Sequence, residues 1–360
     1  MPLRVVIAGG GTGGHLYPGI AVARELVARQ PDTFVSFVGT ARGLEARVVP
    51  REGFTLDLIR SGGLKGKSIL ARAWGASILP LSLVDAWRIL SARRPQLVVG
   101  VGGYSSGAVV LVAALRGMAT MVLEQNAVPG LTNRLLAPFV GAAAVAFEST
   151  REFFGPKAFV SGNPVRQEFL GAKELSSDDR ASTVGVLVFG GSQGAHAINV
   201  AMVAAAAELA ASGSLVRFTH QTGERDLEMV RAAYRDVGLT ADVEPFLYDM
   251  GRRIWQADLI VCRAGATTLA EITAAGKAAI LVPLPTATDD HQLRNAEMLA
   301  SAGAADLLPQ AEMSGPGLAR RILELARDEG RRARMAAAAR ALARPDAARA
   351  IVDRLLELAG

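Results

Sequence analysis

Short apolar segments alternate with helical patterns along almost the whole chain, and two of these segments run directly into glycine-rich turns. Residues 5–8 lead into the turn at 9–14, and Val184–Phe189 leads into the turn at 190–194. A helical pattern follows each turn, so strand, turn and helix open both halves of the chain. Strands that alternate with helices form parallel sheets. We therefore expect an α/β fold of two Rossmann-like domains facing across a cleft, with ligand at the carboxyl ends of both sheets.

Two breaks that contain proline place the domain boundary. Ser-Gly-Asn-Pro at 161–164 separates the halves, because proline restricts the residue before it. A second break at 344–345 precedes one last helical pattern. The expected domains are 1–163 plus 345–360, and 164–344. The expected strands are 5–8, 34–38, 97–101, 121–123, 143–146, Val184–Phe189, 216–219, Leu259–Cys262 and 279–282.

Composition excludes several classes of protein and of site. Half of the 360 residues are hydrophobic and 20% are charged, which excludes a disordered chain. The single cysteine, Cys262, excludes a disulfide framework and a cysteine-based metal site. The four histidines lack metal-ligand spacing, and the sequence has no Asp-x-Asp pair for a metal-bound nucleotide diphosphate. We expect no cofactor and no metal.

Neither a signal peptide nor a membrane-spanning helix is predicted. The first apolar run reaches glycines within eight residues, which is too short for a signal peptide. No window holds 18 uninterrupted apolar residues. These features predict a protein without a membrane span that works in the cytoplasm.

Basic residues are concentrated in one segment, although the net charge of +5 is modest. Residues 61–94 hold six basic side chains against Asp85 alone, together with Trp74, Trp87 and several isoleucines and leucines. Basic and apolar residues together predict an anionic membrane surface as partner, and no nucleic acid. The alternative is an ordinary buried helix whose basic side chains are solvated. The arginines of 320–360 alternate with acids, which is typical of a solvated helix face.

The first glycine turn, GGGTGGH at 9–15, fits two common nucleotide-binding patterns poorly. A dinucleotide site expects an acid about 20 positions on, yet the next strand ends at 39–40 and Glu45 comes later, in the next expected helix. A P-loop needs lysine where His15 stands. A backbone cradle that ends in a histidine remains. At a helix N-terminus the imidazole stays neutral and could act as general base, the alternative being a capping or core histidine.

Small-residue turns also follow other strands. The turn at 190–194 could hold a diphosphate through backbone N–H groups, with Ser192 as a further donor. A third glycine cluster lies at 102–107. In the second half, Thr268-x-x-Glu271 is either a capping box or a carboxylate that binds ribose hydroxyls. A polar cluster with Asp289, Asp290, His291, Gln292 and Asn295 could bind sugar hydroxyls or merely occupy a loop.

Seven motifs occur in the order of a known family, over residues 5–296. They are GGGTGGHLYP at 9–18, GGYSSG at 102–107, EQN at 124–126, GNPVR at 162–166, GGSQGA at 190–195, CRAGA at 262–266 and DDHQ at 289–292. In these motifs the chain resembles the MurG family of bacterial undecaprenyl-diphospho-muramoylpentapeptide β-N-acetylglucosaminyltransferases.

The resemblance implies a GT-B fold and a hexosyltransferase that moves GlcNAc from UDP-GlcNAc to lipid I, with inversion and without a metal, to form lipid II for peptidoglycan. It also implies peripheral attachment at the cytoplasmic face of the inner membrane, and His15 as the base. The implied donor-binding residues are Thr12, Gly13, Gly14, Asn126, Arg166, Ser192, Leu247, Ala266, Thr267, Thr268, Leu269, Glu271 and Gln292, and the implied acceptor-side residues are Tyr104 and Glu124. Tyr248 departs from the family, in which a small or acidic residue is frequent at this position.

Three competing hypotheses remain. A UDP-sugar epimerase on the same scaffold would release UDP without a lipid acceptor. A dehydrogenase is disfavoured by the absent ribose acid. A nucleotide sensor at the membrane would bind UDP-GlcNAc without turnover.

Overall fold

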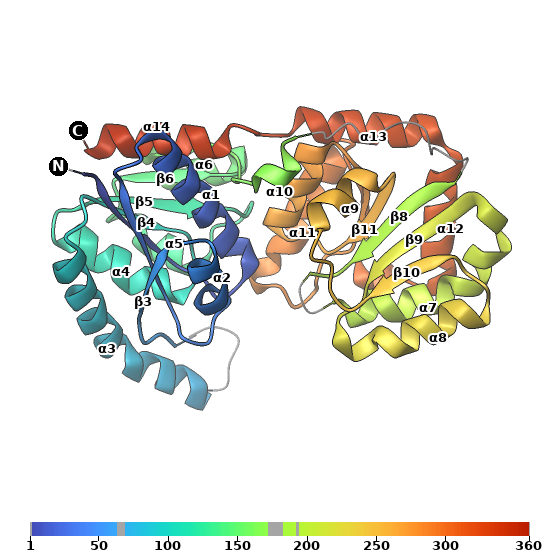
Figure 1. Cartoon of the computed structure of the whole chain (residues 1–360), viewed down its shortest axis with the longest axis horizontal. Coiled ribbons are helices and arrows are strands. Elements are labelled where there is room, and N and C mark those ends of the chain that lie inside the picture. Colours follow the sequence, from blue (N-terminus) through green and yellow to red (C-terminus); the bar gives the residue numbers. More distant parts are fainter. Residues whose placement is uncertain (1, 63–68, 172–182, 192–193, 360) are drawn as a thin grey trace. The chain divides into compact units, whose positions relative to one another are not determined.

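The computed structural model describes residues 2–62, 69–171, 183–191 and 194–359. The chain divides into two compact units, one formed by Met1–Arg166 with Arg344–Gly360 and the other by Gln167–Ala343. The sequence placed the two boundaries after 163 and after 344. Figure 1 shows that each unit has its own sheet with helices on both faces.

The first unit is built on a seven-stranded sheet in the order β3-β2-β1-β4-β5-β6-β7, with every recorded pair parallel. Its strands are β1 (Arg4–Ala8), β2 (Phe34–Gly39), β3 (Thr55–Leu58), β4 (Leu97–Gly100), β5 (Ala119–Glu124), β6 (Ala142–Val145) and β7 (Ala158–Val160). Its helices are α1 (Gly13–Arg29), α2 (Glu45–Arg51), α3 (Ile69–Arg93), α4 (Tyr104–Leu115), α5 (Leu131–Leu136), α6 (Glu148–Phe154) and α14 (Ala347–Ala359).

The second unit has a six-stranded sheet in the order β10-β9-β8-β11-β12-β13, again parallel. Its strands are β8 (Val184–Phe189), β9 (Val216–Gln221), β10 (Ala241–Glu244), β11 (Leu259–Cys262), β12 (Ala278–Leu281) and β13 (Asp306–Leu307). Its helices are α7 (His196–Ala211), α8 (Leu227–Asp236), α9 (Met250–Gln256), α10 (Ala266–Ala275), α11 (His291–Ser301), α12 (Gly315–Arg327) and α13 (Glu329–Ala341).

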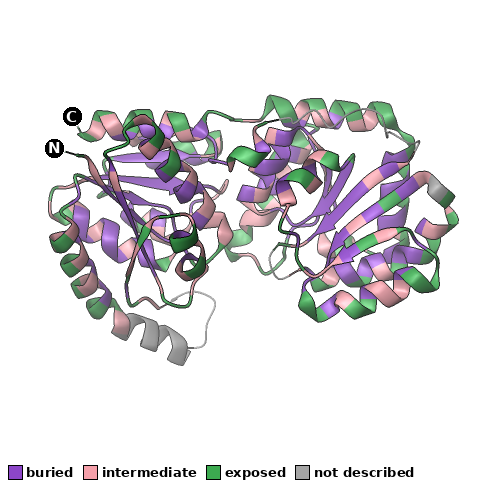
Figure 2. Cartoon of the chain, in the orientation of Figure 1, coloured by how far each residue is buried: buried purple, intermediate pink, exposed green. Residues whose placement is uncertain are grey.

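The central strands are buried on both faces, which explains their uninterrupted apolar sequences. Successive side chains of β1 point to opposite faces. Val5 and Ile7 pack in one core with residues of α1 and α14, while Val6 and Ala8 pack in the other with residues of α4. Figure 2 shows the same burial along both sheets. The last helix of the chain therefore completes the core of the first unit.

The four strands that the sequence did not predict are the two edges of each sheet, namely β3, β7, β10 and β13. Their burial is partial, as in β3, where two residues are exposed and two half-buried. An edge strand pairs on one side only and needs no continuous apolar run. The α/β class and the nine inner strands are confirmed.

Each sheet has one point at which the strand order reverses. In the first unit this point lies between β1 and β4, whose ends are level because Ala8 pairs with Gly100. In the second unit it lies between β8 and β11, where Phe189 pairs with Cys262. The connections leave such a point in opposite directions and open a crevice at the carboxyl ends of the strands. The glycine turns follow these strands.

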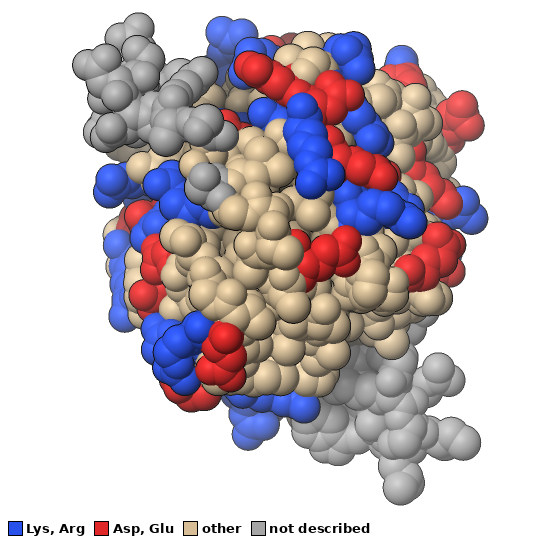
Figure 3. Space-filling view, turned by 90° about the vertical axis from the view of Figure 1, so that its right-hand side faces the viewer, with Lys and Arg blue, Asp and Glu red and all other residues tan. Residues whose placement is uncertain are grey.

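Two charge and hydropathy predictions can be compared with the structure. The arginines near the C-terminus pair with acids, as in Arg321–Asp306 at 2.7 Å and Arg354–Glu357 at 2.7 Å. Figure 3 shows a face on which basic and acidic side chains lie beside one another. Among the described residues, no helix is long and apolar enough to cross a membrane.

A buried polar network joins three elements of the second unit. The Nδ2 group of Asn199 donates to the Thr222 carbonyl, so its Oδ1 accepts from Nε2–H of His220 at 3.0 Å. Nδ1 of His220 then accepts from the Tyr234 hydroxyl at 2.8 Å. Burial lowers the pKa of His220 to about 3, so the ring is neutral in the folded protein.

This network predicts acid sensitivity. The unfolded chain protonates His220 near pH 6.5, whereas the folded chain does so only near pH 3. Between these values the free energy of unfolding should fall as the pH falls, by about 1.4 kcal/mol per pH unit from this group. The free energy of unfolding, measured with urea at several pH values, should depend less steeply on pH in His220→Gln than in His291→Gln. If the free energy of unfolding depended equally on pH in the two variants, His220 would not be the source of the acid sensitivity.

Candidate functional site

The first glycine turn has a backbone that side chains rarely tolerate. Gly9, Gly10 and Gly11 have φ values of +145°, +149° and +86°. A Cβ atom on Gly9 would lie 2.5 Å from the Gly102 carbonyl oxygen, so glycine is needed for close approach as well as for conformation. Thr12 then caps α1 through its carbonyl, which accepts from Leu16 N–H at 3.1 Å. Its side chain makes no capping bond.

His15 lies in the first turn of α1 and is half-buried. Its ring rests on the turn that follows β4: a Cβ atom on Gly102 would lie 2.8 Å from Cδ2 and 3.0 Å from Nε2 of the ring. Gly103 also lies beside the ring, because a Cβ atom on it would be 3.7 Å from Nδ1 of His15. The structure therefore brings the glycine clusters at 9–14 and 102–107 together around His15. Figure 1 shows α1 and α4 starting at the same edge of the sheet.

Glu124 ends β5 and is buried, with 3% of its surface exposed. Its Oε1 accepts from the N–H and Nδ2 groups of Asn126, at 3.1 and 3.2 Å. Its Oε2 accepts from Gly130 N–H and Asn133 Nδ2, each at 2.9 Å. This carboxylate thus braces the loop that carries Asn126. Tyr104, the first residue of α4, is 40% exposed at the same edge.

Arg166 closes the first unit and is half-buried. Its guanidinium lies over the ring of Tyr17, 4.6 Å from the ring centroid. Tyr17 stands on α1, two residues after His15. A cation held by an aromatic face near an anion-binding helix terminus is well placed to contact phosphate.

In the second unit, the turn after β8 is as tight as the first. Gly194 has a φ of +75°, and a Cβ atom there would overlap the Thr222 carbonyl oxygen. The turn leads directly to His196, where α7 begins and its N-terminal N–H groups become available. Ser192, predicted as a phosphate donor, lies outside the described residues.

The turn after β11 bears on one of the two interpretations of Glu271, the capping box. Helix α10 begins at Ala266 with Gly265 as its N-cap, so Thr268 lies inside the helix and cannot be the cap residue. The capping-box interpretation is therefore wrong. Glu271 is 6% exposed and close enough to Cys262 to help raise the pKa of that thiol, which burial raises first. Ala266 and Thr267 open the helix, and Leu269 is buried.

Arg263 holds this turn in place. Its guanidinium donates to the carbonyls of Val282 and Pro283, both at 3.1 Å, and to Oε1 of Gln310 at 2.7 Å. Asn295 donates from Nδ2 to the Ala264 carbonyl at 3.4 Å. These bonds join the ends of β11 and β12 to α11.

The polar cluster after β12 is a strained turn followed by α11. Asp289 and Asp290 have φ values of +54° and +50°, a left-handed conformation that aspartate tolerates better than most residues. Oε1 of Gln292 accepts from Leu284 N–H at 3.0 Å, which leaves the Gln292 amide as the donating group. His291 bonds the Thr288 carbonyl at 2.6 Å.

Two neighbouring residues before α9 differ sharply in exposure. Leu247 is 5% exposed, whereas Tyr248 is 90% exposed. The ring of Phe246 packs edge-on against that of Tyr248, with centroids 4.9 Å apart. The aromatic side chain at the departure from the family pattern therefore points to solvent.

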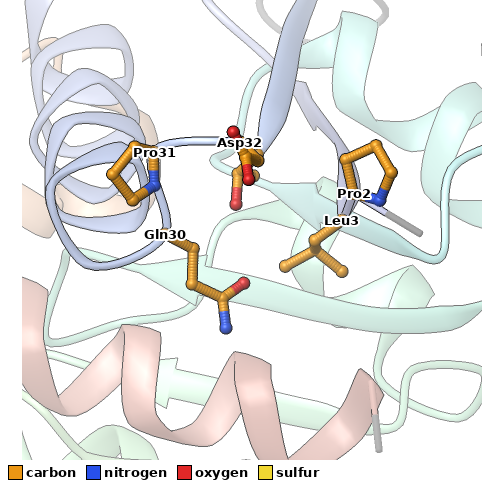
Figure 4. A pocket seen from close by; sticks show the side chains of 6 residues that line it. Pro2, Leu3, Gln30, Pro31 and Asp32 are labelled. Carbon is orange, nitrogen blue, oxygen red and sulfur yellow. The ribbon is translucent and has the colours of Figure 1, made fainter.

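The hollow in Figure 4 lies away from these turns. It is lined by Pro2, Leu3, Gln30, Pro31, Asp32 and Thr33. These residues precede β1 and β2, whereas the glycine turns follow the carboxyl ends of their strands. Ligands of parallel α/β sheets bind at the carboxyl ends, so this hollow is not the candidate site. Within the described ranges, no cluster of three or more His, Cys, Asp or Glu could hold a metal ion.

Glu45 is the residue of this site that sequence reasoning missed. A ribose-binding acid is expected at the end of the second strand, whereas Glu45 is the first residue of α2, so the dinucleotide pattern assigned it no role. Glu45 is 1% exposed and accepts a hydrogen bond from Gly11 N–H at 2.7 Å. The sequence feature that could have indicated a buried side chain here is the set of glycines that surround Glu45, at 10, 39 and 43.

Two parallel α/β units, each with a glycine turn and a helix start at its switch point, have the architecture of GT-B glycosyltransferases. Residues 5–145 match the glycosyltransferase family 28 N-terminal domain, and residues 185–351 match the family 28 C-terminal domain. The chain belongs to glycosyltransferase family 28.

Relatives match over nearly the whole chain. One from Anaeromyxobacter sp. (strain K), named UDP-N-acetylglucosamine--N-acetylmuramyl-(pentapeptide) pyrophosphoryl-undecaprenol N-acetylglucosamine transferase, is 49% identical and covers 99% of this chain and 93% of its own length. One with the same name from Geotalea uraniireducens (strain Rf4) is 47% identical, with 98% of each chain covered. The crystal structure of Acinetobacter baumannii MurG has a TM-score of 0.81 at 32% identity, covering 99% of this chain and 100% of that one.

A more distant structure shares only the fold. A putative UDP-N-acetylglucosamine 2-epimerase from Listeria monocytogenes has a TM-score of 0.70 at 16% identity, covering 98% of this chain and 95% of that one.

Proposed function

We propose that this chain transfers N-acetylglucosamine from UDP-N-acetylglucosamine to N-acetylmuramyl-(pentapeptide) pyrophosphoryl-undecaprenol, with inversion at the anomeric carbon. The observation that carries the proposal is the 49% identity over 99% of the chain to a relative named for this reaction. The arrangement of His15 against the glycine turn at 102–107 supports it, since an inverting transfer needs a base beside the acceptor hydroxyl.

In this mechanism the His15 imidazole takes the proton of the acceptor hydroxyl. The resulting oxygen attacks the anomeric carbon on the face opposite UDP, the new glycosidic bond forms, and the bond to the diphosphate breaks. UDP leaves with both electrons of that bond. The start of α7, the turn at 263–266 and Arg166 would stabilise the diphosphate by hydrogen bonds and charge.

The remaining contacts to UDP-GlcNAc are proposed at two helix starts and at three side chains or main-chain groups of the second unit. Thr12, Gly13 and Gly14 lie at the start of α1, while Ala266, Thr267, Thr268 and Leu269 lie at the start of α10, so both sets lie at the positive end of a helix dipole, which favours a bound anion. Glu271 would accept the ribose hydroxyls, the main chain at Leu247 would meet uracil, and Gln292 would donate to the sugar. Asn126 and Tyr104 lie with His15 at the edge of the first sheet.

The direct test is acceptor dependence. Purified protein incubated with radiolabelled UDP-GlcNAc should transfer label to the lipid-linked acceptor and release one UDP per sugar moved. UDP release of equal rate without acceptor would favour an epimerase instead, and binding without release would favour a sensor.

We further infer that α3 docks on an anionic membrane, as a peripheral contact at the cytoplasmic face of the inner membrane. Leu79, Leu81, Val84 and Trp87 are 44–56% exposed, which is unusual for a helix that only covers a sheet. The guanidinium of Arg116 lies 4.6 Å from the Trp87 ring centroid, so a basic group accompanies the apolar face. The exposure of Trp87 disfavours an ordinary buried helix. Lys65 and Lys67, which contribute to the predicted basic segment, lie outside the described residues.

Replacement of the proposed base should affect turnover rather than donor binding. His15→Ala should lower kcat by about 10²–10⁴-fold, because no group then takes the acceptor proton. The KM for UDP-GlcNAc should change little. Steady-state kinetics with saturating acceptor measure both constants, and a large rise in KM with kcat retained would make His15 a binding residue.

Glu271 should show the opposite behaviour. Glu271→Gln removes a charged acceptor of ribose hydroxyls, which acts before and during the reaction, so the donor KM should rise about 10–100-fold. The melting temperature should stay close to that of the unmodified protein, because Glu271 does not cap α10. Glu297→Gln, on the exposed face of α11, is the matched control. An unchanged KM in Glu271→Gln would remove the residue from the donor site.

The membrane proposal predicts a loss of vesicle binding when α3 becomes acidic. Leu81→Glu with Trp87→Glu should weaken binding to vesicles of phosphatidylglycerol and phosphatidylcholine at least about tenfold, since both apolar burial and charge attraction are lost. Met229→Glu with Val237→Glu, two exposed apolar positions of the second unit, should bind as the unmodified protein does. Equal binding of both double variants in a flotation assay would place the docking surface elsewhere.

A further inference from the structure

Glu45, the first residue of α2, is a buried acid with a well-defined set of partners. Acidic side chains are rarely buried unless hydrogen-bonded or paired, yet Glu45 is 1% exposed. In the part of the chain that the structure describes, the partners of its carboxylate are two backbone N–H groups and one hydroxyl. The Oε2 atom accepts from Gly11 N–H at 2.7 Å. The Oε1 atom accepts from the N–H and Oγ1 groups of Thr40, at 2.8 and 2.9 Å.

The surrounding backbone leaves room for this carboxylate by omitting side chains. A Cβ atom on Gly10, Gly39 or Gly43 would overlap the Glu45 side chain. These glycines come from three separate segments: the turn after β1, the end of β2 and the loop before α2. Gly39 and Gly43 have ordinary φ values, so space rather than conformation accounts for glycine there.

The bond to Gly11 bears directly on the catalytic turn. A backbone bond from Gly9 N–H to the Val38 carbonyl, at 3.0 Å, also joins the turn at 9–14 to β2. A chain of glycines has many accessible conformations, and fixing each residue costs about 1–2 kcal/mol. The Glu45 carboxylate holds the middle of the turn, four residues before His15.

We propose that Glu45 is a positioning residue: its carboxylate fixes the glycine turn in the conformation that presents His15 and the start of α1 to the reacting groups. The inference rests on the proposed function for its effect on catalysis. The hold on the turn is a separate property, which can be measured without activity. Glu45 has no proposed contact with substrate, because its oxygens are buried and occupied.

Glu45→Gln is the first variant. A carboxamide has one acceptor oxygen, so its NH₂ group must face either Gly11 N–H or Thr40 N–H, where two donors repel. Glu45→Ala removes both acceptor oxygens, so hydrogen exchange of peptides covering 5–16 should show one amide, that of Gly11, exchanging at least about tenfold faster in that variant. Glu52→Gln, which loses only an exposed contact with Arg24, should exchange as the unmodified protein does.

The loss of hydrogen bonds at Glu45 should also lower kcat. A displaced base costs up to about 10²-fold, so Glu45→Gln should lower kcat about 10–100-fold. The affinity for UDP, measured by titration calorimetry, should fall less than kcat does, because the contacts proposed for ribose and uracil, at Glu271 and Leu247, lie in the second unit. A residue needed only for folding would instead lower the melting temperature and leave the kcat of the folded fraction unchanged.

Gly43→Ala gives an independent approach to the same contact. The added methyl displaces the carboxylate, so this variant should lower kcat as Glu45→Gln does. In a Glu45→Ala background the three atoms nearest to the added methyl are gone, and Gly43→Ala should then have little further effect. Gly171→Ala, whose Cβ position is open, is the matched control.

The outcomes separate the two proposals. Faster exchange at Gly11 with a lowered kcat and non-additive Gly43 and Glu45 changes supports the positioning role. Unchanged exchange, unchanged kcat or additive effects would overturn it. If the unmodified protein transfers no GlcNAc while exchange at Gly11 still depends on Glu45, the proposed function fails and the hold on the turn stands.

Discussion

Close approach of backbone to backbone at the carboxyl ends of β1 and β4 is the constraint on which the first unit's site depends. Gly9 meets the Gly102 carbonyl, the His15 ring rests on Gly102, and Gly103 meets the Gly10 carbonyl, at distances that leave no room for a Cβ atom. The parallel sheet imposes this meeting, because all its strands end at one edge and the strand order reverses between these two. Glycine is thus required on both sides of the switch point.

In the second unit, other residues allow close approach of the backbone at the carboxyl ends of the strands. Gly194 faces the Thr222 carbonyl, and the turn after β11 is held by Arg263 and Asn295 rather than by a carboxylate. Both units therefore present helix starts beside turns that contain glycine. Fixed backbone donors of this kind stabilise developing negative charge without reorganising, which suits the departure of a diphosphate.

The sequence predicted the inner strands and failed at the edges for a physical reason. An inner strand is buried on both faces and needs consecutive apolar residues, whereas an edge such as β10, Ala-Asp-Val-Glu, is half-exposed and resembles a loop in sequence. Periodicity also could not show where α10 begins: Thr268 fits a capping box, but Gly265 precedes a helix that starts three residues earlier. Glu45 was not predicted as part of the site because its partner in the glycine turn, the Gly11 N–H, lies 34 positions away in sequence and no motif links the two residues.

The central claim is an inverting transfer driven by a base on the first unit. It is tested most directly by the anomeric configuration of the product, read by proton NMR of the disaccharide released from the lipid product. UDP-GlcNAc carries the sugar in the α configuration, so direct attack predicts a β-linked GlcNAc and no glycosyl-enzyme intermediate. An α-linked product would contradict the account, because retention requires a second displacement that His15 alone does not provide.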